Sequence, residues 1–323
     1  MDLSVRDLSL PVPDRLSTSR LRAAVIGSYG FIGAQLHAKL AMAGAAVTGF
    51  TRQDPIFGPD GRPHEKLLAA DVLFYLATSV SPGTAEQRPD LVASDQELFA
   101  TLVDRLAEEV RPPFVVLAGT GGYVYDPASP LPFGEESPVA PRTAYGRAKI
   151  DLERALADRA AKVPGISLRL STVYGPGQRL RTGQGVIAHW FTAAASGRPL
   201  RLFGDPATLR DYVYIDDVVA ALARVGEVGR SGAELPEVIN IGSGRPTQLG
   251  ELLDLVVATV PGPVEVERLP GRGFDHYDAV LDIQLAAEVV GWRPETSLPA
   301  GLAKTWWALS ADEPPAPTNV EGQ

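Results

Sequence analysis

Residues 22–50 read RAAVIGSYGFIGAQLHAKLAMAGAAVTGF, and their pattern predicts a strand, a glycine-rich turn, a helix and a second strand in succession. The turn carries glycines at positions 27, 30 and 33. Gly27 permits a tight turn, Gly30 lets the backbone approach a pyrophosphate, and Gly33 lets the helix pack close to the sheet. The helix N-terminus would offer free N–H groups and a partial positive charge to phosphates. We therefore predict that this turn binds a dinucleotide.

The end of the second strand, Phe50-Thr51-Arg52-Gln53, bears on the choice of cofactor. An NAD site usually has an acidic residue here for the ribose hydroxyls, whereas an NADP site has an arginine for the 2′-phosphate. Thr51 stands where the acid is expected and Arg52 follows it, although Arg52 is also compatible with a solvated loop charge. We predict NADP (NADPH) as the cofactor, with NAD as the alternative.

The rest of the chain continues the alternation of strands and helices. Clear strands are expected at 71–77 and 113–118, and a further strand is expected somewhere in the Pro- and Gly-rich stretch 54–70. This order predicts an α/β fold, with a Rossmann doubly wound parallel sheet and a smaller C-terminal α/β substrate lobe. The predicted parts are an N-terminal extension (1–20), an NAD(P)-binding domain (21–175), a substrate lobe interleaved with it (176–312) and a tail (313–323).

The elements of the substrate lobe follow from the same reasoning. Thr247 and Asp282 are predicted to cap the helices that follow them. The predicted helices are 185–196, 216–225, 247–260 and 298–309. The predicted strands are 200–203, 210–215, 238–242 and 264–267.

Composition excludes several classes of function. The net charge of −9 argues against nucleic acid as a partner, because phosphate backbones need a basic face. There are no cysteines and only four scattered histidines, so we predict no metal site. The first twenty residues contain no apolar segment typical of a signal peptide or membrane span, and we predict a cytoplasmic protein with no membrane contact.

The stretch Thr143-Ala144-Tyr145-Gly146-Arg147-Ala148-Lys149 opens a strong helix-forming run. Positions i and i+4 lie on one face of a helix, so Tyr145 and Lys149 are predicted to point into the same space. A lysine cation favours the phenolate and lowers the pKa of tyrosine from its ordinary value near ~10. The pair is therefore a candidate acid–base couple, although a core tyrosine beside a solvated lysine would give the same spacing.

Together the glycine turn, Thr120 and Tyr145-x-x-x-Lys149 resemble the extended short-chain dehydrogenase/reductase family. Within that family the chain resembles the nucleotide-sugar branch of epimerases, dehydratases and ketoreductases. Four later motifs add to the resemblance: Arg169-Leu-Ser-Thr-Val-Tyr-Gly-Pro176, Arg210-Asp-Tyr-Val-Tyr-Ile-Asp-Asp217, Asn240-Ile-Gly-Ser-Gly244 and Gly291-Trp-Arg-Pro294.

The resemblance implies roles for individual residues. Tyr145 would be the acid/base on the sugar oxygen, Lys149 would lower its pKa and hold the nicotinamide ribose, and Thr120 would hydrogen-bond the same sugar oxygen. The implied cofactor-binding residues are Gly27, Tyr29, Gly30, Phe31, Ile32, Gly33, Thr51, Arg52, Leu76, Ala77, Tyr145 and Lys149.

For the substrate, the resemblance implies a nucleotide sugar, and a dTDP-hexose is expected. It also implies that the protein is a homodimer. Arg210 and Arg272 would clamp the diphosphate, with Asp275 positioning Arg272. Further implied contacts come from Thr172, which replaces the family's usual asparagine, and from Gln184, Val186, Leu202 and Phe203.

One departure from the family separates the possible reactions. The 4,6-dehydratases carry Thr-Asp-Glu where this chain has Thr120 followed by Gly121 and Gly122, so dehydration is disfavoured. We predict an NADPH-dependent 4-ketoreductase of a dTDP-4-keto-6-deoxyhexose. The composition, rich in Ala, Arg and Pro, is typical of high-GC bacteria, in which such reductases serve deoxysugar and antibiotic biosynthesis. The alternatives are a nucleotide-sugar 4-epimerase with tightly bound NAD and a non-catalytic NADP-binding sensor or scaffold.

Overall fold

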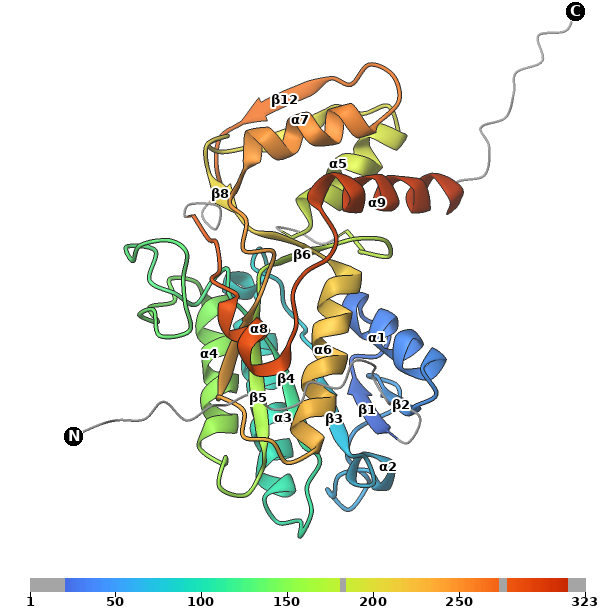
Figure 1. Ribbon diagram of the computed structural model, residues 1–323, viewed down its shortest axis with the longest axis vertical. Helices are drawn as coiled ribbons and strands as arrows, with labels where there is room; N and C mark the ends of the chain where they lie inside the picture. The colour runs from blue at the N-terminus through green and yellow to red at the C-terminus, as the bar shows by residue number, and fades with distance from the viewer. Residues whose placement is uncertain (1–20, 181–183, 273–277, 313–323) are drawn as a thin grey trace, which may run out of the picture.

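A computed structural model describes residues 21–180, 184–272 and 278–312. Its centre is a six-stranded, all-parallel sheet with the strand order β10-β5-β4-β3-β1-β2 (Figure 1). This is the predicted doubly wound Rossmann sheet. The six strands are β1 (Arg22–Ile26), β2 (Ala46–Phe50), β3 (Val72–Tyr75), β4 (Phe114–Thr120), β5 (Gly165–Leu170) and β10 (Val238–Ile241).

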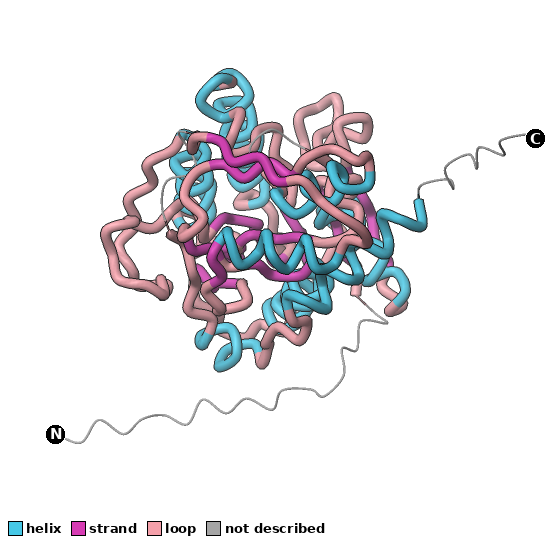
Figure 2. Tube along the Cα trace, turned by 90° about the horizontal axis from the view of Figure 1, so that it is seen from above, coloured by secondary structure: helices cyan, strands magenta, loops and turns pink. Residues whose placement is uncertain are grey.

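Helices cover both faces of this sheet (Figures 1 and 2). Successive residues of β1 show why: Ala23 and Val25 belong to one apolar core, whereas Ala24 and Ile26 belong to the other. The first core is closed by α1 (Phe31–Met42) and α6 (Ile215–Arg230), and the second by α3 (Pro89–Leu106) and α4 (Ala144–Ala157).

The stretch 54–70 does not contain the expected strand. The structure places an isolated bridge between Phe57 and Pro63 there, followed by the short helix α2 (Glu65–Leu68). Three prolines and two glycines interrupt residues 55–63, and proline cannot donate a ladder hydrogen bond. β2 is consequently the edge of the sheet.

The second lobe lies over the carboxyl ends of the strands, at the top of Figure 1. Its parallel strand pair β7–β12 packs with three helices, and two further pairs, β6–β9 and β8–β11, join it to the first lobe. The chain then returns to the main sheet for α6 and β10. The remaining elements are η1 (Ala85–Gln87), β6 (Thr172–Tyr174), α5 (Val186–Ala195), β7 (Leu200–Phe203), β8 (Leu209–Arg210), β9 (Tyr212–Tyr214), β11 (Thr247–Gln248), α7 (Leu249–Thr259), β12 (Val266–Leu269), α8 (Gln284–Val290) and α9 (Leu298–Asp312).

Several predicted boundaries in this lobe are wrong. The strand expected over 210–215 breaks into β8 and β9 at Asp211, whose side chain is tied to other loops. The strand expected at 264–267 lies two residues later, as β12. Thr247 belongs to β11 and does not cap α7, whereas the Asp282 carboxylate does accept the Gln284 N–H (2.9 Å) at the start of α8.

Candidate functional site

The glycine-rich turn between β1 and α1 has the shape of a pyrophosphate cradle. Gly27 has a φ of +88°, and a Cβ there would lie 3.0 Å from the backbone nitrogen of Ala77. A Cβ at Gly33 would collide with the Gly27 carbonyl oxygen. Gly30 caps α1 without a side chain, and the first turn has no acidic residue. The N–H groups there are open to an anion, so the turn fits the phosphates of a dinucleotide.

Charged groups of both signs lie at the end of β2. Arg52 donates to the hydroxyl of Ser79 (3.2 Å), which lies in the loop after β3. The Thr51 hydroxyl accepts the N–H of Gln53 (3.1 Å) and donates to the Asp54 carboxylate (3.2 Å). Sequence reasoning missed Asp54, because only folding of this loop returns its carboxylate to Thr51. An acid is therefore available beside the predicted arginine.

Tyr145 and Lys149 both lie on the buried face of α4, as their spacing predicted. The Thr143 hydroxyl caps this helix by accepting the Gly146 N–H (3.0 Å). Lys149 Nζ donates to the carbonyl oxygen of Ala118 in β4 (3.1 Å) and lies 5.9 Å from the centroid of the Tyr145 ring. Burial lowers the pKa of Lys149 to about 8. The amino group of Lys149 is thus held next to the phenol of Tyr145.

Thr120 is the last residue of β4 and is buried. Alternation along the strand assigns its side chain to the same face as Val116 and Ala118, which belong to the α1/α6 core, whereas α4 lies on the other face. Its predicted partnership with Tyr145 therefore stays a prediction. A Cβ added at Gly122, two residues on, would meet nothing within 4 Å, so the space beyond the strand is open.

Two residues that the sequence did not single out contact or adjoin this pair. The ring of Tyr123 stands edge-on to that of Tyr145, with centroids 5.6 Å apart and an interplanar angle of 84°. Asp95, on α3, lines the same small cavity as Tyr145 and Lys149. No local pattern marks either residue, because both reach the site only through packing of separate segments.

The predicted diphosphate ligands lie on different elements of the second lobe. The Arg272 guanidinium stacks on the ring of Phe203, 4.3 Å from its centroid. Arg210 is half-buried in β8, and its Nη1 donates to the carbonyl oxygen of Leu209 (3.0 Å). Asp275 lies outside the described residues.

The other predicted substrate residues differ in exposure. Leu202 is only 1% exposed and belongs to the main core, whereas the adjacent Phe203 is half-buried. The contacts predicted between these two side chains and the base stay a prediction. Thr172 is half-buried in β6. Val186 opens α5 and is partly buried, whereas Gln184, two residues earlier, is exposed.

Two further observations concern the described residues only. They contain no group of His, Asp and Glu side chains that could hold a metal ion. Among them, too, every helix is either too short or too polar to cross a membrane.

Comparisons with known proteins agree with this architecture. The NAD dependent epimerase/dehydratase family matches residues 23–242. A UDP-glucose 4-epimerase of Mycolicibacterium smegmatis is 29% identical, over 88% of this chain and 97% of its own. A dTDP-6-deoxy-L-talose 4-dehydrogenase (NAD(P)(+)) of Kitasatospora kifunensis is also 29% identical, over 91% and 97%.

A solved structure shows the same fold. The UDP-glucose 4-epimerase of Thermus thermophilus, in complex with NAD, superimposes with a TM-score of 0.78 at 25% identity, covering 91% of this chain and 100% of that one. The chain therefore belongs to the NAD dependent epimerase/dehydratase family, within the extended short-chain dehydrogenases/reductases.

Proposed function

We propose that the protein is an NADPH-dependent 4-ketoreductase of a dTDP-4-keto-6-deoxyhexose. The observation that carries the proposal is the placement of Tyr145 and Lys149 on the buried face of α4, with Lys149 anchored to β4. Similarity to the dTDP-6-deoxy-L-talose 4-dehydrogenase over nearly the whole chain supports this substrate class. The predicted homodimer and the cytoplasmic location are further proposals.

The chain's own residues perform the proton chemistry. NADPH, held by the glycine turn and Lys149, would supply the hydride that reduces the keto carbon. Tyr145 donates its phenolic proton to the keto oxygen, so the carbonyl becomes a hydroxyl and a phenolate remains. The Lys149 ammonium stabilises that phenolate, and solvent returns the proton.

The end of β4 supports reduction over dehydration. Elimination of water from the sugar needs a general acid and a base beside the tyrosine. Gly121 and Gly122 offer neither, and a side chain at Gly122 would meet open space. We assign this space to the sugar ring.

The second candidate is a nucleotide-sugar 4-epimerase with tightly bound NAD. The observation that favours it is Asp54, whose carboxylate lies at the strand end where an NAD site has its acid. Similarity to the UDP-glucose 4-epimerase of M. smegmatis points the same way.

The deciding experiment measures NADPH oxidation with a freshly prepared dTDP-4-keto-6-deoxyhexose. We expect steady turnover with the wild-type protein. Tyr145→Phe removes the proton donor and keeps the ring, so kcat should fall by about 10²- to 10⁴-fold while NADPH affinity is retained.

A parallel assay supplies UDP-glucose without added cofactor. Conversion to the 4-epimer, together with NAD released on denaturation, would establish the epimerase instead. Absence of both activities in a protein that binds NADP would support the sensor.

A further inference from the structure

Asp95 faces the catalytic pair from a neighbouring helix. It lies on α3 and lines a cavity of about 10 Å³ with Tyr145 and Lys149. A space of this size holds no more than about one water molecule, so it is a junction between side chains and cannot admit a sugar.

The carboxylate of Asp95 also holds the loop that follows β3. It accepts the backbone N–H of Ser79 (2.6 Å), the Ser79 hydroxyl (2.7 Å) and the Thr78 hydroxyl (3.4 Å). The Ser79 hydroxyl in turn accepts a hydrogen bond from Arg52. A single side chain thus connects the loop beside the dinucleotide turn to the helix pair that carries Lys149.

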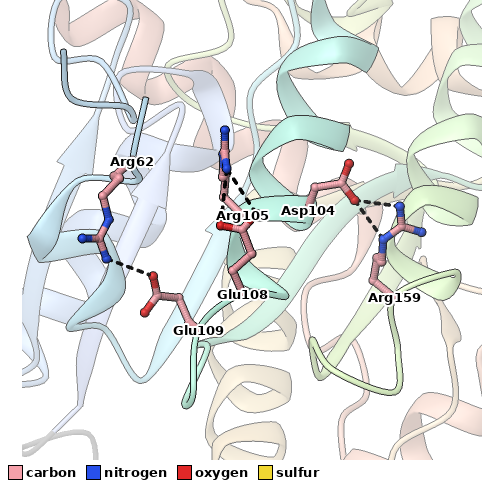
Figure 3. A network of polar contacts seen from close by, with 6 residues as sticks. All are labelled: Arg62, Asp104, Arg105, Glu108, Glu109 and Arg159. Carbon is pink, nitrogen blue, oxygen red and sulfur yellow. Dashed lines mark hydrogen bonds and ion pairs between the residues drawn. The ribbon is translucent and has the colours of Figure 1, made fainter. Parts of the chain in front are cut away.

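The two helices are tied together next to Asp95 and again further along. Gln96, the next residue on α3, donates to Asp151 of α4 (2.7 Å). Further along the pair, Arg159 donates to Asp104 (2.8 Å; Figure 3). These contacts fix where the Asp95 carboxylate lies relative to Lys149.

The charges near Lys149 are not equivalent. Burial lowers the pKa of Lys149, and the charges of Asp95 and Glu153 oppose that effect, with Asp95 the larger. Glu153 is already bound by the buried Arg169 guanidinium (2.8 Å) and by the Ser167 hydroxyl (3.2 Å). Asp95 accepts only from neutral groups and forms no ion pair within the described part of the chain. Its negative charge is therefore the one left to balance the lysine.

We propose that Asp95 is a positioning residue that holds the loop 78–80 in place and keeps Lys149 protonated beside Tyr145. This inference rests on the proposed function only in assigning acid–base chemistry to Tyr145. The groups that face Lys149 are the Ala118 carbonyl from β4, Tyr145 and Glu153 from α4, and Asp95 from α3.

The test reads Lys149 directly. The chain has five lysines, so protein labelled with ¹³C at the lysine ε-carbon gives few NMR signals, and Lys149→Met assigns the one of interest. In wild-type protein we expect its titration midpoint near 8. Asp95→Asn keeps the shape and removes the charge, which should lower the midpoint by about one pH unit.

Two variants control this measurement. Glu97→Gln removes an equal charge from an exposed position on the same helix and should leave the midpoint in place. Asp95→Glu retains the charge and should keep the midpoint within about half a unit of wild type. If Asp95→Asn does not fold, Asp95→Ser, which also lacks the charge and can still accept the Ser79 N–H, takes its place: a midpoint lowered by about one pH unit supports the proposal, and an unchanged midpoint overturns it.

A kinetic readout follows the same logic. If the protein reduces the proposed keto sugar, the alkaline limb of its pH profile of kcat/KM should move to lower pH in Asp95→Asn. The shift should be about one pH unit, as for the lysine titration. An unchanged lysine titration in Asp95→Asn would overturn the role of Asp95, whatever the substrate. A shifted titration in a protein that reduces no dTDP-keto sugar would sustain it and overturn the proposed function instead.

Discussion

The end of β2 holds the two residues that we propose distinguish NADP from NAD. Arg52 can pair with a 2′-phosphate, and Asp54 can accept from ribose hydroxyls, yet they lie two residues apart in one short loop. Because Arg52 is linked to Ser79 and through it to Asp95, the proposed ligand of the 2′-phosphate and the loop 78–80 share the same hydrogen bonds.

Replacing Arg52 with Ala should weaken NADPH and scarcely affect NADH. A charge-assisted hydrogen bond of about 1.5–3 kcal/mol corresponds to a loss of roughly 10- to 150-fold in affinity. Titration calorimetry with both cofactors measures this, and Arg62→Ala, an exposed arginine paired with Glu109, is the control. Equal weakening of NADPH and NADH would shift the proposal to the NAD-dependent epimerase.

Residues of the candidate site could be predicted from the sequence only where their spacing along the chain fixes their relative positions. Tyr145 and Lys149 share a face because they are one helical turn apart, and Gly27 and Gly33 are required by a turn that no Cβ fits. Asp95 reaches the site only because α3 packs on α4, a contact between segments some fifty residues apart in the chain.

Among the elements, two aspartates of the motif 210–217 anchor later loops. Asp211 is 1% exposed and accepts from the Ser243 N–H (2.7 Å), the Ser243 hydroxyl (2.6 Å) and the Gly244 N–H (3.1 Å). Asp217 accepts the N–H groups of residues 295 and 296, just after the Gly-Trp-Arg-Pro motif. The motif 210–217 thus holds both later motifs in place, and the hydrogen bonds of Asp211 explain why the predicted strand breaks there.

Asp211→Asn should destabilise the protein without altering Tyr145 or Lys149. The amide would direct its own N–H groups at backbone donors in a buried site, at a cost on the order of 3 kcal/mol. We expect a melting temperature several degrees lower than in wild type. Asp216→Asn, at the exposed position between the two anchors, is the matched control. Equal melting temperatures for the two variants would refute the anchoring role.

The element prediction failed where local signals conflict with long-range pairing. Residues 54–70 were expected to hold a strand because a doubly wound sheet often has one there, but prolines and glycines prevent it. β8 and β11 are only two residues long and exist because they pair with each other. No periodicity in so short a segment could reveal them.

At the scale of the whole molecule, the chain leaves the Rossmann sheet, builds the second lobe and returns for α6 and β10. The cofactor turn and the candidate diphosphate ligands therefore belong to two lobes joined by several crossings. A ligand that contacts the second lobe should stabilise the entire fold, because the chain runs from that lobe back into the main sheet through α6 and β10.

A nucleoside diphosphate should accordingly protect the protein against heat. Binding to the folded state alone adds about 2.7 kcal/mol when the ligand is at 100 times its Kd, by mass action. We expect dTDP at millimolar concentration to raise the melting temperature, with or without NADPH. Arg210→Ala and Arg272→Ala should each remove most of that rise and leave the NADPH effect intact, because the two guanidiniums are the proposed phosphate ligands. Arg201→Ala, an exposed arginine of β7 paired with Glu267, is the control and should keep the full dTDP effect. A melting series in which neither dTDP nor UDP moves the midpoint would exclude nucleotide sugars as the substrate class, while a rise that survives both arginine variants would place the diphosphate elsewhere.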